Sequence, residues 1–239
     1  MSPRRYILLA LLPALFVVGG HVILQYLGGW QVLEGRLIGP DAYMRLLRVR
    51  ELWDGGGWYD AVSARGNAPF GEILHWTRPL DVLLLVGGAL GALSMDFETA
   101  LFAWAAVIGP LLHLVTLLVL LWACRPLFDQ VFDPASDQAS LVRLGLLFAV
   151  QFFISFQFAA GRPDHHGLNT MLFIAQMGFA FRLSRAGCEA KTALWAALAA
   201  ALALWISIEG GLGAAMILTT LTAAWVLHGG PYLRRLCGF

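Results

Sequence analysis

An unbroken apolar segment from Tyr6 to Leu27 follows Arg4 and Arg5, and it limits the folds that the chain can adopt. A helix needs about 20 apolar residues to cross the hydrocarbon core of a bilayer, and this segment is long enough. A cleaved signal peptide is the alternative, but its apolar part is usually about 7–15 residues long, and no small-x-small cleavage site follows here. We therefore expect a retained membrane helix whose start lies in the cytoplasm with its two arginines.

Five later segments are similarly apolar, and the whole chain is 59% hydrophobic and 13% charged. Soluble domains carry about 25% charged residues, so we expect an all-α polytopic membrane protein with about six transmembrane helices. We interpret residues 1–239 as a single transmembrane domain, in which 28–99 form a long first outer loop with amphipathic or interfacial helices and 100–230 form a helical bundle. The later spans are expected at Ala100–Ala123, Leu141–Ala160, Thr170–Phe181 (extended at both ends), Ala193–Ile208 and Gly211–His228.

The apolar segment Leu80 to Leu93 is too short to cross a bilayer comfortably, and its placement decides the topology. If it lies on the outer surface, the basic residues of the later short loops fall on the cytoplasmic side, as the positive-inside rule requires. These residues are Arg125, Arg143, Arg182, Arg185 and Lys191. If it spans, the last three fall outside, so we expect an interfacial helix here.

The first outer loop contains Gly39-Pro40-Asp41, a typical helix start, and we expect a helix from Asp41 to Trp53 that ends at Gly55-Gly56-Gly57. Asp41, Arg45 and Arg48 fall on one face of this helix, which can hold a metal or a phosphate. The alternative is an exposed surface helix whose Asp–Arg pair contributes a few tenths of a kcal/mol.

A short polar segment, Gly161 to Asn169, separates two apolar runs and contains Arg162, Asp164, His165 and His166. Ionisable side chains at the mouth of membrane helices are costly unless they are partnered, which makes them functional candidates. In the expected topology they reach the same outer face as Asp41 and Glu209, so these residues can converge on one cation. Oxygen ligands favour Mg²⁺ or Mn²⁺, and a histidine ligand shifts the choice towards Mn²⁺ or a softer metal. The alternatives are that Glu209 caps the turn between two spans and that the histidines lie among lipid head groups.

Several classes of function are disfavoured. The net charge of +1 gives no concentrated basic surface for nucleic acid. The three cysteines are scattered and do not form a disulfide framework, and no H-E-x-x-H metalloprotease motif occurs.

Two motifs, G-P-D-A-Y-M-R-L-L-R-V-R at 39–50 and G-R-P-D-H-H-G at 161–167, resemble the C-type glycosyltransferase (GT-C) superfamily. The resemblance is strongest to the catalytic subunit of oligosaccharyltransferase and its bacterial membrane relatives. It implies that Asp41 is the first-loop acid, that Asp164 is the first acid of the second motif, and that His166 stands where the second acid usually is. The family's donor is a sugar linked to polyprenyl phosphate or pyrophosphate.

The resemblance implies transfer of a sugar from such a donor to an unknown acceptor, on the periplasmic face of a bacterial inner membrane. The expected catalytic residues are Asp41, Asp164, His165 and His166, and the expected metal ligands are Asp41, Asp164 and His166, with Mn²⁺ or Mg²⁺ as the cation. The residues expected to bind substrate are Arg45, Arg48, Arg162 and Glu209. Relatives have more spans and a soluble C-terminal domain, so we also expect a truncated copy or a fragment.

Two other classes of function stay open. A non-catalytic remnant or assembly subunit is compatible with the missing C-terminal part. A small polytopic transporter needs its ionisable residues near the midplane of the membrane, where only His113 clearly lies.

Overall fold

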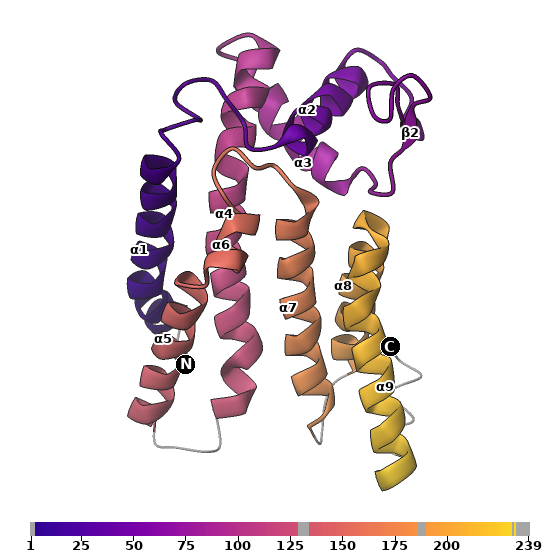
Figure 1. The fold of residues 1–239 in the computed structure, drawn as a ribbon. Coiled ribbons are helices and arrows are strands. Elements are labelled where there is room, and N and C mark those ends of the chain that lie inside the picture. Colours follow the sequence, from indigo (N-terminus) through magenta and orange to yellow (C-terminus); the bar gives the residue numbers. More distant parts are fainter. Residues whose placement is uncertain (1–2, 129–133, 186–189, 231, 233–239) are drawn as a thin grey trace. The chain divides into compact units, whose positions relative to one another are not determined.

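The structure is a computed structural model that describes residues 3–128, 134–185, 190–230 and 232, and these residues are mostly helical (Figure 1). The chain divides into two compact units, one formed by residues 17–113 and 152–168 and the other by 1–16, 114–151 and 169–239. The elements are α1 (Pro3–Leu27), α2 (Pro40–Trp53), β1 (Val62–Ser63), β2 (Glu72–Ile73), α3 (Pro79–Gly91), α4 (Phe97–Phe128), α5 (Pro134–Ala149), α6 (Phe152–Gln157), α7 (His165–Leu183), α8 (Ala190–Ile206), η1 (Ile208–Gly210) and α9 (Gly211–His228).

Three helical segments of the described chain are long and apolar enough to cross a membrane: Leu8–Leu27, Phe97–Phe128 and Ile208–His228. They overlap the expected first, second and sixth spans, which supports the membrane character of the chain. The expected fourth span lies within α7, and the expected fifth begins in α8 and ends two residues after it, at Ile208. The full set of six spans stays a prediction.

The expected third span differs from the structure, because Leu141–Ala160 is not one helix. The helix α5 ends at Ala149, and the short α6 begins at Phe152. The Gln151 N–H bonds to the Phe148 carbonyl, three residues back, which closes the helix with a tight last turn. The following β-branched and aromatic residues are weaker helix formers, and the chain passes from one compact unit to the other at this break.

The segment between α1 and α4, which the sequence predicts to be the first outer loop, carries two helices that contact each other, α2 and α3. The helix α2 starts and ends where the Gly-Pro-Asp and triple-glycine signals predict. The helix α3 occupies the segment expected at the outer surface, and its buried residues Leu80, Leu84 and Gly88 repeat every four positions. A two-stranded antiparallel hairpin, β1–β2, pairs Val62 with Ile73 between the two helices in sequence.

The polar segment after α6 is fixed by its backbone at Gly161. The Gly161 N–H donates to the Ala106 carbonyl of α4 (2.9 Å), and its carbonyl accepts from the Ile38 N–H (2.8 Å). Gly161 has a φ of 82°, and an added Cβ would lie 2.6 Å from Val32 Cγ2. Only glycine fits this position, which sets where the chain enters the segment before α7.

In the other unit, residues of α7, α8 and α9 share an apolar core. It consists of Leu183, Ala193, Ala196, Ile217 and Leu221. Small residues in α8 let these helices approach closely, as is typical of membrane helices.

Candidate active site

Among the described residues, Asp164, His165 and His166 form a group whose potential metal-binding atoms all lie within 4.8 Å of one another. Asp164 immediately precedes α7, and the two histidines form its first turn. His165 Nδ1 lies 2.8 Å from Asp164 Oδ1, and His166 Nε2 lies 3.9 Å from Asp164 Oδ2. Asp164 and His165 are buried, while His166 is partly exposed, so the group is open on the side of His166.

The surroundings of Asp164 favour its ionised form. Burial alone would raise the pKa of this carboxyl, but the hydrogen bond from His165 and the charges of His166, His165 and Arg162 hold it well below its usual range. Arg162 Nη2 donates to Asp164 Oδ2 at 3.1 Å. The carboxylate also stands at the amino end of α7, where the helix dipole favours a negative charge. These surroundings favour the carboxylate form of Asp164 at neutral pH.

The two nitrogens of His165 have different surroundings. Nδ1 is within hydrogen-bond distance of Asp164 Oδ1, and the tautomer that donates this bond leaves a lone pair on Nε2. Nε2 is buried and has no hydrogen-bond partner among the residues that the structure describes. Nε2 lies on the far side of the ring from Asp164, so a cation shared by Asp164 and His165 would take the place of this hydrogen bond, with Nδ1 as the ligand atom. The donor set thus fits a divalent cation.

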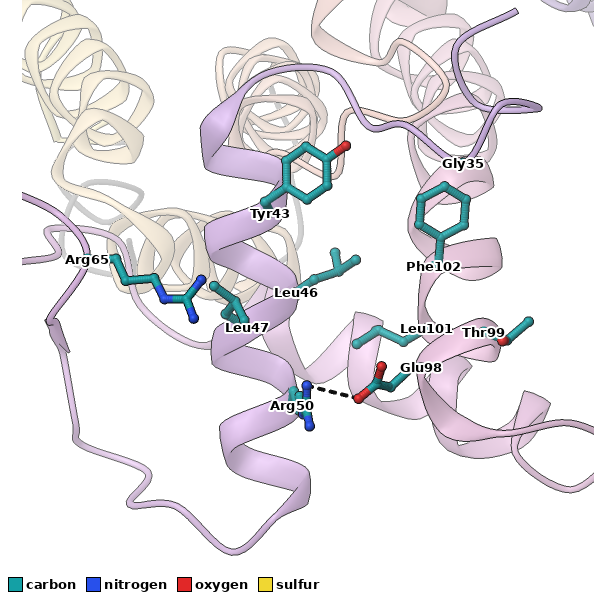
Figure 2. Close-up of a pocket in the computed structure, with 10 residues that line it drawn as sticks. All are labelled: Gly35, Tyr43, Leu46, Leu47, Arg50, Arg65, Glu98, Thr99, Leu101 and Phe102. Atoms are coloured by element: carbon teal, nitrogen blue, oxygen red, sulfur yellow. Dashed lines mark ion pairs between the residues drawn. The ribbon is translucent and has the colours of Figure 1, made fainter.

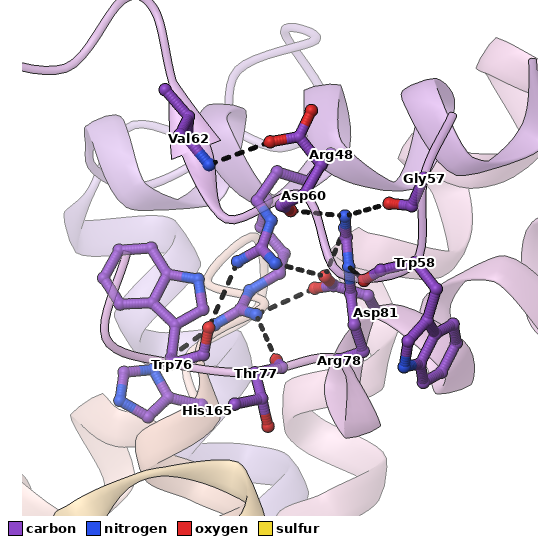
Figure 3. A network of polar contacts seen from close by, with 11 residues as sticks. Arg48, Gly57, Trp58, Asp60, Val62, Trp76, Thr77, Arg78, Asp81 and His165 are labelled. Carbon is purple, nitrogen blue, oxygen red and sulfur yellow. Dashed lines mark hydrogen bonds and ion pairs between the residues drawn. The ribbon is translucent and has the colours of Figure 1, made fainter. Parts of the chain in front are cut away.

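A buried carboxylate that the sequence analysis missed, Asp81, lies at the centre of a network next to this group (Figure 3). It pairs with Arg45 at 2.8 Å, Arg78 at 3.1 Å and Arg48 at 3.5 Å. All four side chains are at least nine-tenths buried. Burial lowers the pKa of Arg48, and the charges of Arg78 and Arg45 lower it further, while Asp81 opposes this change.

The Asp81 network is connected to His165 and to the loop before β1. Arg45 Nη2 lies 3.4 Å from His165 Nδ1, and its guanidinium group lies over the ring of Trp76, which in turn stacks on His165. Arg78 donates to the carbonyls of Gly57, Trp58 and Asp60, as Figure 3 shows. The network therefore fixes one side of His165.

The structure separates the residues that the sequence placed together on α2. Arg45 and Arg48 turn inward to Asp81, whereas Asp41 is exposed. No hydrogen bond or ion pair joins Asp41 to another described residue, and Asp41 is not part of the Asp164 group. The alternative of an exposed helix with its own Asp–Arg pair does not describe α2, because the arginines pair with α3 instead.

Glu209 lies in η1, in the other compact unit. The cap of this turn is Ser207, whose Oγ accepts the Glu209 N–H at 3.2 Å. The expectation that Glu209 belongs to the site stays a prediction.

Asp81 had a weak signal in the sequence. It is an acid in the first turn of an otherwise apolar helix, three residues after Arg78. An ionisable residue in such a helix is a functional or structural candidate by default.

The chain is similar over most of its length to a solved oligosaccharyltransferase. Two structures of the Archaeoglobus fulgidus enzyme, one in complex with Zn and sulfate and one in the apo form, align with TM-scores of 0.73 and 0.71. The sequence identities are 19% and 18%, and the alignments cover 95% and 93% of this chain. The chain shares the fold of an oligosaccharyltransferase.

The shared part is less than a third of the archaeal protein, since the alignments cover 29% and 26% of those chains. No protein-family model and no curated protein sequence matches the chain. The relation to oligosaccharyltransferase that the two motifs predict is thus confirmed at the level of the fold.

Proposed function

We propose that this protein transfers a sugar from a polyprenyl-phosphate-linked donor to an acceptor, at the periplasmic face of a bacterial inner membrane. The observation that carries the proposal is the group of Asp164, His165 and His166, whose potential ligand atoms lie within 4.8 Å of one another, in a fold shared with an oligosaccharyltransferase over 95% of the chain. In this proposal the region around Asp164 lies at the outer surface, as the loop charges predict.

In this proposal Asp164, His165 and His166 hold a divalent cation. Two imidazole donors beside one carboxylate favour Mn²⁺ or Zn²⁺ over Mg²⁺, because Mg²⁺ prefers oxygen ligands. The archaeal neighbour was solved with Zn. When bound, such a cation neutralises the phosphate leaving group.

The arginines divide into two roles. Arg162 is about one-fifth exposed and pairs with Asp164, so its remaining N–H groups can bind a donor phosphate. Arg45 and Arg48 are buried and bonded to Asp81, and we assign them to positioning His165 and to the positive potential around it. Their direct contact with phosphate stays a prediction.

Asp41 is the exposed acid of the proposal. Its carboxylate is available at the start of α2, and we assign it to orienting the acceptor or completing the cation site. The acceptor itself is a lipid, a protein or a polysaccharide, and the assay must sample all three.

The test uses the purified protein in liposomes with a radiolabelled polyprenyl-phosphate sugar and a panel of acceptors. We expect transfer that is lost with a chelator, restored by Mn²⁺ or Zn²⁺, and abolished in Asp164→Asn and Asp41→Asn. The matched control is Asp54→Asn, an exposed acid of the same unit whose ion-pair partner among the described residues is Arg50. Full activity in both Asp164→Asn and Asp41→Asn would refute the proposal, and donor binding without transfer to any acceptor would favour a non-catalytic subunit.

A further inference from the structure

A cavity of about 690 Å³ lies between α2 and the start of α4, away from the candidate active site (Figure 2). Its volume is within the range of about 300–1,000 Å³ that small-molecule pockets occupy. Its walls are mainly apolar or aromatic, from Tyr43, Leu46, Leu47, Leu101 and Phe102. None of Asp164, His165 and His166 lines it.

The cavity wall that α2 contributes is a different face of this helix from the one that meets Asp81. Tyr43, Leu46, Leu47 and Arg50 are spaced three and four residues apart and so share one face, while Arg45 and Arg48 turn to Asp81. The Tyr43 hydroxyl accepts a hydrogen bond from the Leu37 N–H at 2.9 Å, which fixes the ring. The apolar wall is therefore preformed, and covering it with an apolar chain is favourable.

The cavity also carries positive charge. Arg50 pairs with Glu98 at 2.9 Å, as Figure 2 shows between α2 and α4, and with Asp54 at 3.7 Å, so the surplus positive charge comes from Arg65. Arg65 is exposed, turns its guanidinium group towards Leu47, and forms no ion pair with any residue in the described part of the chain. A guanidinium group offers several N–H donors in a fork that matches phosphate oxygens.

The position of the cavity along α4 suits a membrane lipid. The helix has 32 residues, which corresponds to about 48 Å, whereas the hydrocarbon core is about 30 Å thick. The cavity is lined by Glu98, Thr99, Leu101 and Phe102, in the first two turns of this helix. A helix of this length exceeds the hydrocarbon core by about 18 Å, which leaves room for its first two turns at the level of the head groups.

We propose that this cavity binds one anionic phospholipid of the surrounding membrane. The phosphate lies at Arg65, and part of an acyl chain lies against Leu46, Leu47 and Phe102. The donor of the proposed transfer is a different molecule, because its reacting phosphate must reach Asp164. The lipid site stands whether or not the protein transfers sugars.

The experiment uses the full chain in nanodiscs of phosphatidylcholine that contain a minor fraction of phosphatidylglycerol, with native mass spectrometry to count the lipids retained after release. We expect one retained phosphatidylglycerol. Arg65→Gln weakens its retention about tenfold, or about 1.4 kcal/mol, because the phosphate loses a charged partner. Leu47→Trp weakens it similarly by filling the cavity.

The matched controls are Arg36→Gln, an exposed arginine outside the cavity, and Leu93→Trp, an exposed leucine outside it. Both are expected to retain phosphatidylglycerol like the unmodified protein. Arg65 is exposed, so its replacement leaves the fold intact, and a thermal scan checks this. Equal retention in Arg65→Gln, or equal retention of phosphatidylcholine, would overturn the proposal. Displacement by equimolar polyprenyl phosphate would assign the cavity to the donor instead, and displacement by millimolar inorganic phosphate would reduce it to an anion site. Displacement by polyprenyl phosphate or by inorganic phosphate would thus also overturn the phospholipid proposal.

Discussion

The replacement of Asp81 by Asn tests whether the buried network supports the fold of its unit. Asn keeps the size of the side chain and removes its charge, which leaves three buried arginines without their carboxylate. The three pairs have N···O distances of 2.8, 3.1 and 3.5 Å, and the Asp81 side chain is fully buried. At an effective dielectric constant of about 20, one such pair contributes about 5–6 kcal/mol before the cost of desolvation.

Desolvation offsets much of this attraction, and removing one partner of a buried pair typically costs about 3–5 kcal/mol. For a chain of this length, 1 kcal/mol changes the melting temperature by about 2–4 °C. We therefore expect Asp81→Asn to lower the melting temperature by about 6–20 °C, measured by tryptophan fluorescence in detergent. Trp76 packs on Arg45 and reports directly on the network.

The matched control is Glu34→Gln, which removes an acid from the exposed ion pair with Arg36. Exposed pairs contribute about 0–1 kcal/mol, so the control should melt close to the unmodified protein. Adding Arg48→Met to Asp81→Asn removes one of the uncompensated cations and should restore part of the loss, which a double-mutant cycle quantifies. A melting temperature of Asp81→Asn within about 2 °C of the unmodified protein would show that the network does not stabilise the fold.

Three further predictions concern the segment before α7. The folded-state pKa of Asp164 is below its unfolded value of about 3.9, so the folded state binds fewer protons and the stabilisation by Asp164 is complete above that value. The stability difference between the unmodified protein and Asp164→Asn should be constant from about pH 5 to 8 and shrink only below about pH 4; a difference already lost at pH 6 would contradict this. Gly161→Ala should lower the melting temperature more than Gly35→Ala. Both positions have a positive φ, but only at Gly161 would the added Cβ clash with the Val32 side chain. Equal decreases in melting temperature would attribute the loss to backbone strain alone. Calorimetry should find that Mn²⁺ binds more tightly in the presence of polyprenyl phosphate than in its absence, and equal affinities would show that the two do not interact.

The helices α2 and α3 were predictable because their signals are local. Pro40 and Asp41 start α2, three glycines follow its end, and Pro79 starts α3. The long apolar runs likewise predict α1, α4 and α9, because length and hydropathy suffice to identify them.

The break between α5 and α6 was not predictable in the same way. No proline or glycine marks it, and the apolar run continues through Val150 and Phe152. A helix can end within such a run when the residues before and after the break pack against different neighbours. Sequence periodicity does not report which neighbours a segment packs against.

The Asp81 network was missed because its contacts are distant in sequence. Asp81 meets Arg45 across 36 positions, and Arg45 meets His165 across 120. The helical pattern correctly placed Arg45 and Arg48 on one face, but a pattern does not tell whether that face meets solvent or a buried carboxylate. Asp164, His165 and His166 were predicted because consecutive residues stay together whatever the fold.

The charges around the candidate active site predict that a bound anion and a bound cation stabilise each other there. Four arginines surround two carboxylates, since Arg45, Arg48 and Arg78 share Asp81 and Arg162 pairs with Asp164. The positive end of the α7 dipole adds to this surplus. A cation that approaches Asp164 alone meets repulsion from Arg162, whereas a phosphate is attracted before any metal is present. Once a phosphate has compensated the arginines, Asp164 and the two histidines can bind a cation at lower electrostatic cost, so donor and metal are expected to bind cooperatively.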